Sequence, residues 1–398
     1  MMWRWLVTAV LSGSSLCIGG LVLSGHAAEW SAEPSLGVRG EYNSNLLLVA
    51  GPQKPVYGHW VSPGVRFAGS TENLDVSGKA AADLVRYYGG RNQDLLNLYF
   101  PLSVKYGLAR ETFGFDGGFT RDNTLMGELL RTGVVLSFTQ RNMWNLAPSW
   151  SHAFTERLSL QSSYQYSNAT YEDGARLGLV DYQVQGGSTG LAYQPTETDR
   201  MQVTGSYTNF SVPNASAMRS HIVGAQASWS HAFTETLTAT VSGGPQLVTS
   251  SISFGPVRLT DTQTLWVASA NVKKQWDAGF AELVVGREIN PSGFGLLLKT
   301  ERVGINLSHN LTDRLTASVN AQVLLASSIA SKAVPFTFPE NRYINVTPRL
   351  TWKLDQWWSV DAAYTYGRRE VESFGERALG NATTVMLTYY PPKLSVGR

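Results

Sequence analysis

Residues 158 to 167 read LSLQSSYQYS, and this stretch decides the fold. Its even positions are mostly leucine or tyrosine, whereas its odd positions are serine or glutamine. Side chains of a β-strand point alternately to opposite faces, so a period of two indicates a strand with one apolar and one polar face. About ten residues suffice for a tilted strand to cross a bilayer. The stretch therefore predicts one strand in the wall of a membrane barrel.

The same alternation returns in segments that begin at Met201, Leu237 and Leu315. Their polar positions hold small hydroxyl and amide groups, which suit the lining of a water-filled lumen better than a core between two sheets. After residue 28, no segment has the roughly 18 to 20 consecutive apolar residues that a spanning helix needs. A closed barrel is then the structure that satisfies every backbone hydrogen bond in lipid.

A hairpin repeat organises the chain. The sequences SWSHAFTERLSL (149–160), SWSHAFTETLTA (228–239) and NLSHNLTDRLTA (306–317) each end one strand, turn and begin the next. Successive copies are 79 and 78 residues apart with weaker copies between them, so the unit is a hairpin of about 40 residues. Eight such short turns, plus one outer strand at each end, predict an all-β, antiparallel, up-and-down transmembrane barrel of about 18 strands, with about 16 as second choice.

The connections between strands differ at the two ends of the predicted barrel. The short turns are typical of a periplasmic rim, and longer connections rich in Gly, Pro, Asn and Asp, such as 171–180, 212–219, 250–260 and 326–341, are typical of extracellular loops. Both termini are then periplasmic. Pro63, Pro148 and Pro348 lie inside expected strands, where we predict β-bulges. Tryptophans near the short turns predict an interfacial aromatic band, made of Trp150, Trp229, Trp276, Trp352, Trp357 and Trp358.

The first residues predict a secretory signal peptide over 1–27. An apolar run from Leu6 to Leu23 follows Arg4 and ends in small residues, which places cleavage after Ala27 or Ala28. An uncleaved anchor is the alternative. Residues 28–398 then form a single barrel domain, placed in the outer membrane of a Gram-negative bacterium after Sec-dependent export. The single cysteine, Cys17, lies in the leader, so the mature chain has no disulfide or thiolate metal site.

Charge and motifs exclude several functions. The 32 basic and 30 acidic side chains nearly cancel, so no nucleic-acid partner is expected, and outer-membrane lipid is the predicted surrounding. The sequence has no GxSxG elbow, phosphate-binding glycine loop or haem-attachment motif. His152, His231 and His309 occupy the same place in successive hairpins, which spreads them around the rim instead of gathering them at a metal. We therefore expect no enzyme activity, catalytic residue, metal site or cofactor.

The alternation also places polar side chains on the inner face of the barrel. In a wet lumen such groups are tolerated, and they either line it passively or set its selectivity. The expected lining residues are Asp75, Lys79, Asp83, Asp116, Gln161, Gln165, Gln202, Thr204, Glu282, Asn320, Gln322 and Asp361. The segment 122–141 breaks the hairpin rhythm. It predicts either an inward constriction, with Glu128, Arg131 and Arg141 facing the pore, or a strand extension outside the membrane.

Several longer stretches are similar to one protein family. ENLDVSGKAAADLVRYY (72–88), TRDNTLMGELLRTGVV (120–135) and SHAFTERLSLQSSYQYSNATYEDG (151–174) resemble the outer-membrane β-barrel porin family found in exopolysaccharide biosynthesis operons. The resemblance implies passive secretion of an exopolysaccharide, with a periplasmic polysaccharide export protein and the secreted polysaccharide as partners. Two alternatives stay open: a general or substrate-selective porin for small solutes, and a structural barrel sheath around a partner protein.

Overall fold

The structure is a computed structural model that describes residues 29–90, 92–133, 138–213, 218–254, 257–329, 339–372 and 375–397. The predicted signal peptide and its cleavage site lie outside the described residues. The strands are β1 (Glu29–Asn43), β2 (Val56–Ser70), β3 (Leu74–Gly89), β4 (Gln93–Gly107), β5 (Glu111–Asn123), β6 (Gln140–Ala153), β7 (Leu158–Tyr171), β8 (Tyr182–Tyr193), β9 (Asp199–Ser211), β10 (Arg219–Thr234), β11 (Leu237–Phe254), β12 (Val257–Trp276), β13 (Gly279–Pro291), β14 (Leu297–Asn310), β15 (Leu315–Ser328), β16 (Asn341–Lys353), β17 (Trp358–Val371), β18 (Glu376–Tyr389) and β19 (Leu394–Gly397). Three short helical elements are η1 (Leu125–Leu129), α2 (Leu130–Thr132) and η2 (Gly174–Leu177).

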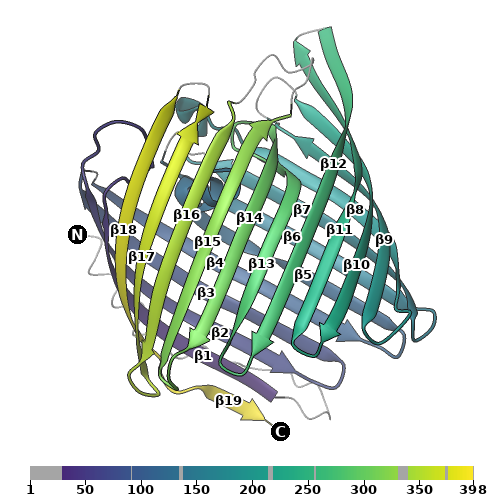
Figure 1. Ribbon diagram of the computed structural model, residues 1–398, viewed down its shortest axis with the longest axis horizontal. Helices are drawn as coiled ribbons and strands as arrows, with labels where there is room; N and C mark the ends of the chain where they lie inside the picture. The colour runs from purple at the N-terminus through teal and green to yellow at the C-terminus, as the bar shows by residue number, and fades with distance from the viewer. Residues whose placement is uncertain are drawn as a thin grey trace.

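The strands form one closed barrel (Figure 1). From β1 to β18, each strand pairs antiparallel with the next, and β18 returns to β1 with Leu36 opposite Tyr389 and Asn43 opposite Ala382. Over the described ranges the wall therefore has eighteen strands, which confirms the predicted count. The short β19 was not expected, and it pairs with Glu29–Ala32 at the start of β1.

Short turns join the strands at one rim, and most connections at the other rim are longer, as predicted. The stretch from Tyr88 to Asp94 was also expected to be a long loop, but β3 ends at Gly89 and β4 begins at Gln93. A second expected loop differs as well. Residues 250–260 were assigned to an extracellular loop, but β11 continues to Phe254 and β12 begins at Val257. Ser251 and Ile252 pair with Thr260 and Leu259. The β11–β12 hairpin therefore extends beyond the neighbouring strands. The hairpin is visible at the upper right of Figure 1.

The outer face of the wall is apolar. Large exposed side chains recur on alternate residues around the ring, for example Leu84, Phe100, Trp144, Tyr164, Val203, Val241, Ile305, Leu350 and Val385. Such a belt is favourable only against lipid. A closed barrel with this belt is an outer-membrane protein, as predicted. None of the helices in the described ranges is long and apolar enough to span a membrane.

The predicted bulges at the prolines are wrong. Around Pro148 of β6, Leu146 pairs with Tyr166 and Ser149 with Ser163, so the register to β7 does not shift. The same holds for Pro63 and Pro348, and each proline keeps its pairing with the strand on its other side. A proline lacks one N–H, so it interrupts the ladder towards a single neighbour without adding a residue to the strand.

Candidate channel and its constriction

Between β5 and β6 the chain turns into the barrel. We call the described part of this connection, residues 124–133 and 138–139, the inward segment. The side-chain oxygen of Asn123 accepts hydrogen bonds from the backbone N–H groups of Leu125 and Met126 at 3.1 and 3.2 Å, which starts the helical turns of η1. Gly133 ends α2 with a φ of 71°, a left-handed conformation that glycine adopts without strain. The connection is therefore folded locally into helix and is not a strand extension.

A buried ion pair fastens the base of the inward segment to the wall. Arg141 donates from Nε and Nη2 to the two carboxylate oxygens of Asp122, at 3.0 and 2.7 Å. Its Nη1 lies 3.7 Å from Oε1 of Glu128. The three side chains are 3 to 8% exposed. Removing one partner of such a pair leaves an uncompensated buried charge, which costs about 3–5 kcal/mol.

Glu128 also connects the inward segment to two other parts of the barrel. Its carboxylate accepts a hydrogen bond from the Tyr171 hydroxyl at the end of β7. It accepts a second one, at 3.4 Å, from the backbone N–H of Gly293 in the β13–β14 connection. At Gly127, an added Cβ would lie 2.3 Å from the guanidinium carbon of Arg141. Glycine at position 127 is therefore required for the arginine to reach both carboxylates.

The tip of the inward segment reaches the opposite wall. The Gly133 carbonyl accepts a hydrogen bond of 2.7 Å from Nδ2 of Asn341 in β16, and Oδ1 of Asn341 accepts one of 2.9 Å from Arg369. Leu129 packs with Leu324 and Tyr343 of β15 and β16. In the ring of eighteen strands, β5 and β6 lie nearly opposite β15 and β16 (Figure 1). The inward segment therefore crosses the lumen.

Apolar clusters fill the space around this crossing. Phe138 packs with Trp60, Tyr87 and Leu95 on the inner face of β2 to β4. Leu48, from the β1–β2 connection, packs with Leu129 in the second cluster. The third cluster covers the inner face of β7 to β11 and includes Tyr182, Phe210, Met218, Ile222 and Val248. The extracellular end of the lumen is thus packed like a protein core.

The predicted constriction residues take different places. Arg141 and Glu128 meet in the buried ion pair. The backbone of Arg131 belongs to α2, and its side chain lies outside the described part of the structure. Asp122 and Tyr171 complete the cluster, and sequence analysis missed both. Tyr171 is 43 residues from Glu128, and no periodicity links two residues at that spacing.

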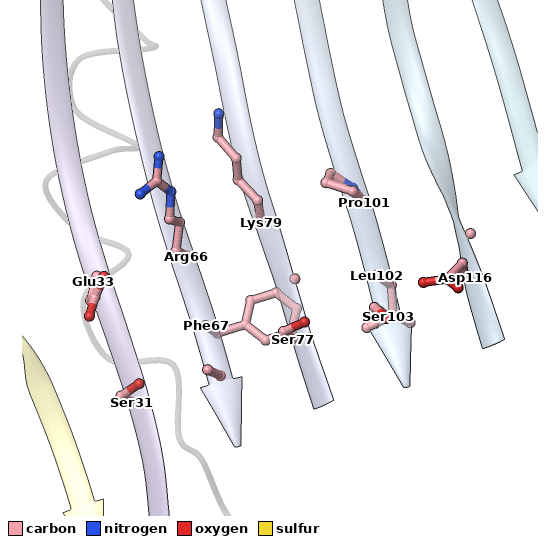
Figure 2. A pocket seen from close by; sticks show the side chains of 13 residues that line it. Ser31, Glu33, Arg66, Phe67, Ser77, Lys79, Pro101, Leu102, Ser103 and Asp116 are labelled. Carbon is pink, nitrogen blue, oxygen red and sulfur yellow. The ribbon is translucent and has the colours of Figure 1, made fainter. Parts of the chain in front are cut away.

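The periplasmic half of the lumen is different and keeps its polar side chains exposed. Figure 2 shows a hollow on the inner wall of β1 to β5 where Glu33, Arg66, Lys79 and Asp116 lie together with serines. Lys79 and Asp116 were predicted to line the lumen; Glu33 and Arg66 were missed, although the alternation around Val65 places Arg66 on the polar face. Asp75 and Asp83 lie on the same face of β3 as Lys79, and Asp75 accepts a hydrogen bond of 2.7 Å from Ser70.

The wall from β6 to β9 is lined mainly by hydroxyl and amide groups. Gln161, Gln202 and Thr204 line one hollow with Thr112, Ser149 and Ser151, and Gln202 donates to Thr204 at 3.1 Å. Gln165 lies on the same face of β7. This hollow adds uncharged donors and acceptors to the inner wall.

Three of the remaining expected lining residues, Glu282, Asn320 and Asp361, form hydrogen bonds to neighbouring strands. Glu282 accepts from Asn271 at 2.8 Å and from Asn306 at 3.0 Å. Asn320 donates to Asn306, with Gln322 two residues along the same face of β15. Asp361 accepts from Thr351 at 2.5 Å. That these groups line a conducting lumen stays a prediction.

The periplasmic rim carries the predicted tryptophans. Trp150, Trp229, Trp276, Trp352 and Trp358 are exposed near strand ends, and Trp357 is half-buried in the β16–β17 turn. Glu111 accepts a hydrogen bond of 2.6 Å from Trp150 and lies 2.5 Å from Nδ1 of His152. Asp199 makes the equivalent contacts in the next repeat, at 2.9 Å to Trp229 and 2.8 Å to His231. His309 accepts from Trp276 at 3.2 Å. Across the described ranges, no three metal-ligating side chains gather.

Comparison with known proteins gives matches among solved structures. No family model and no curated protein matches the chain. OccK7 (OpdD) of Pseudomonas aeruginosa is 10% identical with a TM-score of 0.45, covering 93% of this chain and 99% of its own. OprD, an outer membrane protein of the same organism, is 10% identical with a TM-score of 0.42, covering 92 and 94%. OccK2 (OpdF), in complex with glucuronate, is 8% identical with a TM-score of 0.44, covering 91 and 98%.

The predicted exopolysaccharide exit channel is wrong. No family model matches the chain, so the link to exopolysaccharide operons has no support from the comparisons. The structure gives a physical reason, because the inward segment and its apolar contacts occupy the extracellular end that a polymer would have to pass. The secreted polysaccharide and the periplasmic export protein are therefore no longer expected as partners.

Proposed function

We propose that the protein is a passive outer-membrane channel for small hydrophilic solutes, narrowed at its extracellular end by the inward segment. The observation that carries the proposal is the connection of opposite walls through Asp122, Arg141, Glu128 and Asn341. Under this proposal only single small molecules pass beside the segment, because the connected walls leave no straight path for a chain of sugars or a partner protein. The sheath alternative is disfavoured for the same reason.

The inner wall supports small polar solutes over apolar ones. The hollow of Figure 2 is lined by two cations and two carboxylates, and the wall from β6 to β9 offers neutral hydroxyl and amide groups. Such a lining exchanges hydrogen bonds with a hydrated solute as water does. Passive movement down a gradient uses no catalytic group, so the proposal includes the absence of enzyme activity.

The test measures single-channel conductance in planar bilayers. One variant replaces residues 125–137 by a short Gly-Ser linker, which removes the crossing but keeps both strands. We expect wild-type conductance to be low for an eighteen-stranded barrel and to rise severalfold in the variant. Liposome swelling with sugars of increasing size checks the same point, since only the variant should admit oligosaccharides.

A milder variant protects the test against misfolding. Gly127→Val forces Arg141 away from its carboxylates, whereas Gly40→Val in β1 meets no atom within 4 Å and serves as the control. We expect G127V to raise conductance and G40V to leave it unchanged. Equal, high conductance in wild type, linker variant and G127V would overturn the proposal.

A further inference from the structure

Two neighbouring strands part at the extracellular rim. The ladder between β12 and β13 runs from Trp276 opposite Gly279 to Ala268 opposite Arg287 and ends there. Beyond this point β12 continues to Val257 along β11, and β13 continues to Pro291 along β14. In Figure 1 the upper part of β12 follows β11 above the other strands. The backbone ladder of the wall therefore stops early on this side.

A groove lies on the outer face directly below this point. It is lined by five strands, β11 to β15, and its outward-facing members include Val241, Ala268, Ala270, Val285 and Val303. The wall is hollowed here because two alanines, Ala268 and Ala270, lie among larger apolar residues on the outer face. We call it the seam groove. Its apolar lining suits an alkyl chain lying along the wall.

The seam groove lies at the level of the outer leaflet. Trp266 and Trp276 are ten residues apart on the outward face of β12, a distance that spans the apolar layer on a tilt. Trp276 adjoins a periplasmic turn, so Trp266 marks the opposite interface. The Trp266 side chain is 65% exposed, immediately above Ala268. A chain in the groove would therefore have its head group near Trp266.

Two cations lie near the place where that head group would lie. Arg287 and Lys299 both approach the same oxygen of Glu301, at 3.4 and 3.7 Å. Two cations and one carboxylate leave a net charge of +1. These side chains are 33 to 43% exposed, and ion pairs between such exposed groups are weak. An anionic oxygen can therefore join or replace Glu301 at low cost, and a phosphate offers several oxygens to both cations.

We propose that the seam groove binds one acyl chain of lipid A, the phosphorylated lipid of the outer leaflet, with a phosphate held by Arg287 and Lys299. The lipid covers the wall where the β12–β13 ladder ends and so seals the barrel at that seam. The position of the cations at the extracellular end favours lipid A over the phospholipids of the inner leaflet. The site is independent of what passes through the lumen.

The experiment measures lipid retained by the intact barrel. Protein purified in mild detergent from cells that make lipopolysaccharide is examined by native mass spectrometry. The double variant Arg287→Gln, Lys299→Gln removes the charge, and Ala270→Leu fills the groove. Ala362→Leu, on the exposed outer face of β17 opposite Val385, is the matched control. We expect one lipid A on wild type and control, and about tenfold less on both test variants.

Folding is checked by the faster gel mobility of the unheated barrel and by unchanged conductance. If A270L fails to fold, the double variant decides by itself, because its substitutions are exposed. Equal retention in all folded variants would overturn the proposal. A glycerophospholipid in place of lipid A would overturn it as well, because the assignment rests on the outer leaflet.

Discussion

The two halves of the lumen are built from the same strands but differ in what fills them. On β9 and β10, Gln202 and Ser220 both point inward, yet Gln202 lines an open hollow and Ser220 is fully buried, bonded to Ser250 at 2.9 Å. The difference arises from connections distant in sequence, which fold into the extracellular half. An inward position on a strand therefore does not ensure contact with water. Whether an inward side chain is exposed depends on how far it lies from the extracellular loops.

The largest expected effect comes from removing the charge that fastens the inward segment. Arg141→Met leaves Asp122 and Glu128 buried without their cation, which we expect to destabilise the segment by about 3–5 kcal/mol. Hydrogen exchange of residues 125–132 measures the loss. Arg176→Met is the control, because its pair with Asp173 is 77 and 69% exposed and contributes about 0–1 kcal/mol. Equal protection in both variants would show that the extracellular half is not held by this pair.

Cysteine accessibility sharpens the comparison between the halves. The mature chain is predicted to be free of cysteine, so the labelling of a single introduced cysteine measures the accessibility of that position alone. We expect a water-soluble thiol reagent to label Gln202→Cys rapidly and Ser220→Cys only after unfolding, because one faces the hollow and the other the packed cluster. In the same assay Gln161→Cys should react and Leu160→Cys should not. Labelling of position 160 instead of 161 would mean that the inward and outward faces are exchanged.

The smallest expected effect concerns ion selectivity in the periplasmic half. Arg66→Gln with Lys79→Gln leaves Glu33 and Asp116 in the hollow, so the lumen should become more selective for cations. The reversal potential across a salt gradient measures the shift. Gln161→Asn, on the uncharged wall, should leave it unchanged. The shift should fade near 1 M salt, where the Debye length falls to about 3 Å; a shift that persists there would contradict an exposed, wet hollow.

The sequence predicted the features of the barrel that local pattern decides. The alternation around Gln161 and Gln202, and the repeated turns after His152 and His231, gave strands, count and rims because side-chain period and turn chemistry are local properties. It went wrong at residues 250–260, where small polar residues continued a hairpin instead of a loop. The function implied by the family resemblance was also wrong, and the alternation could not correct it, because an alternating wall does not reveal whether its lumen is narrowed.

The sequence by itself determined an eighteen-stranded outer-membrane barrel, its apolar belt and its polar inner face. Only the tertiary structure decided that the inward segment crosses the lumen and that Glu128 meets Tyr171 and Gly293. It alone also showed that β12 leaves β13 above the seam groove. The physical reason is the sequence separation of the interacting residues. Strands follow from a period of two residues, whereas the packing of loops inside a closed ring depends on partners more than a hundred residues apart.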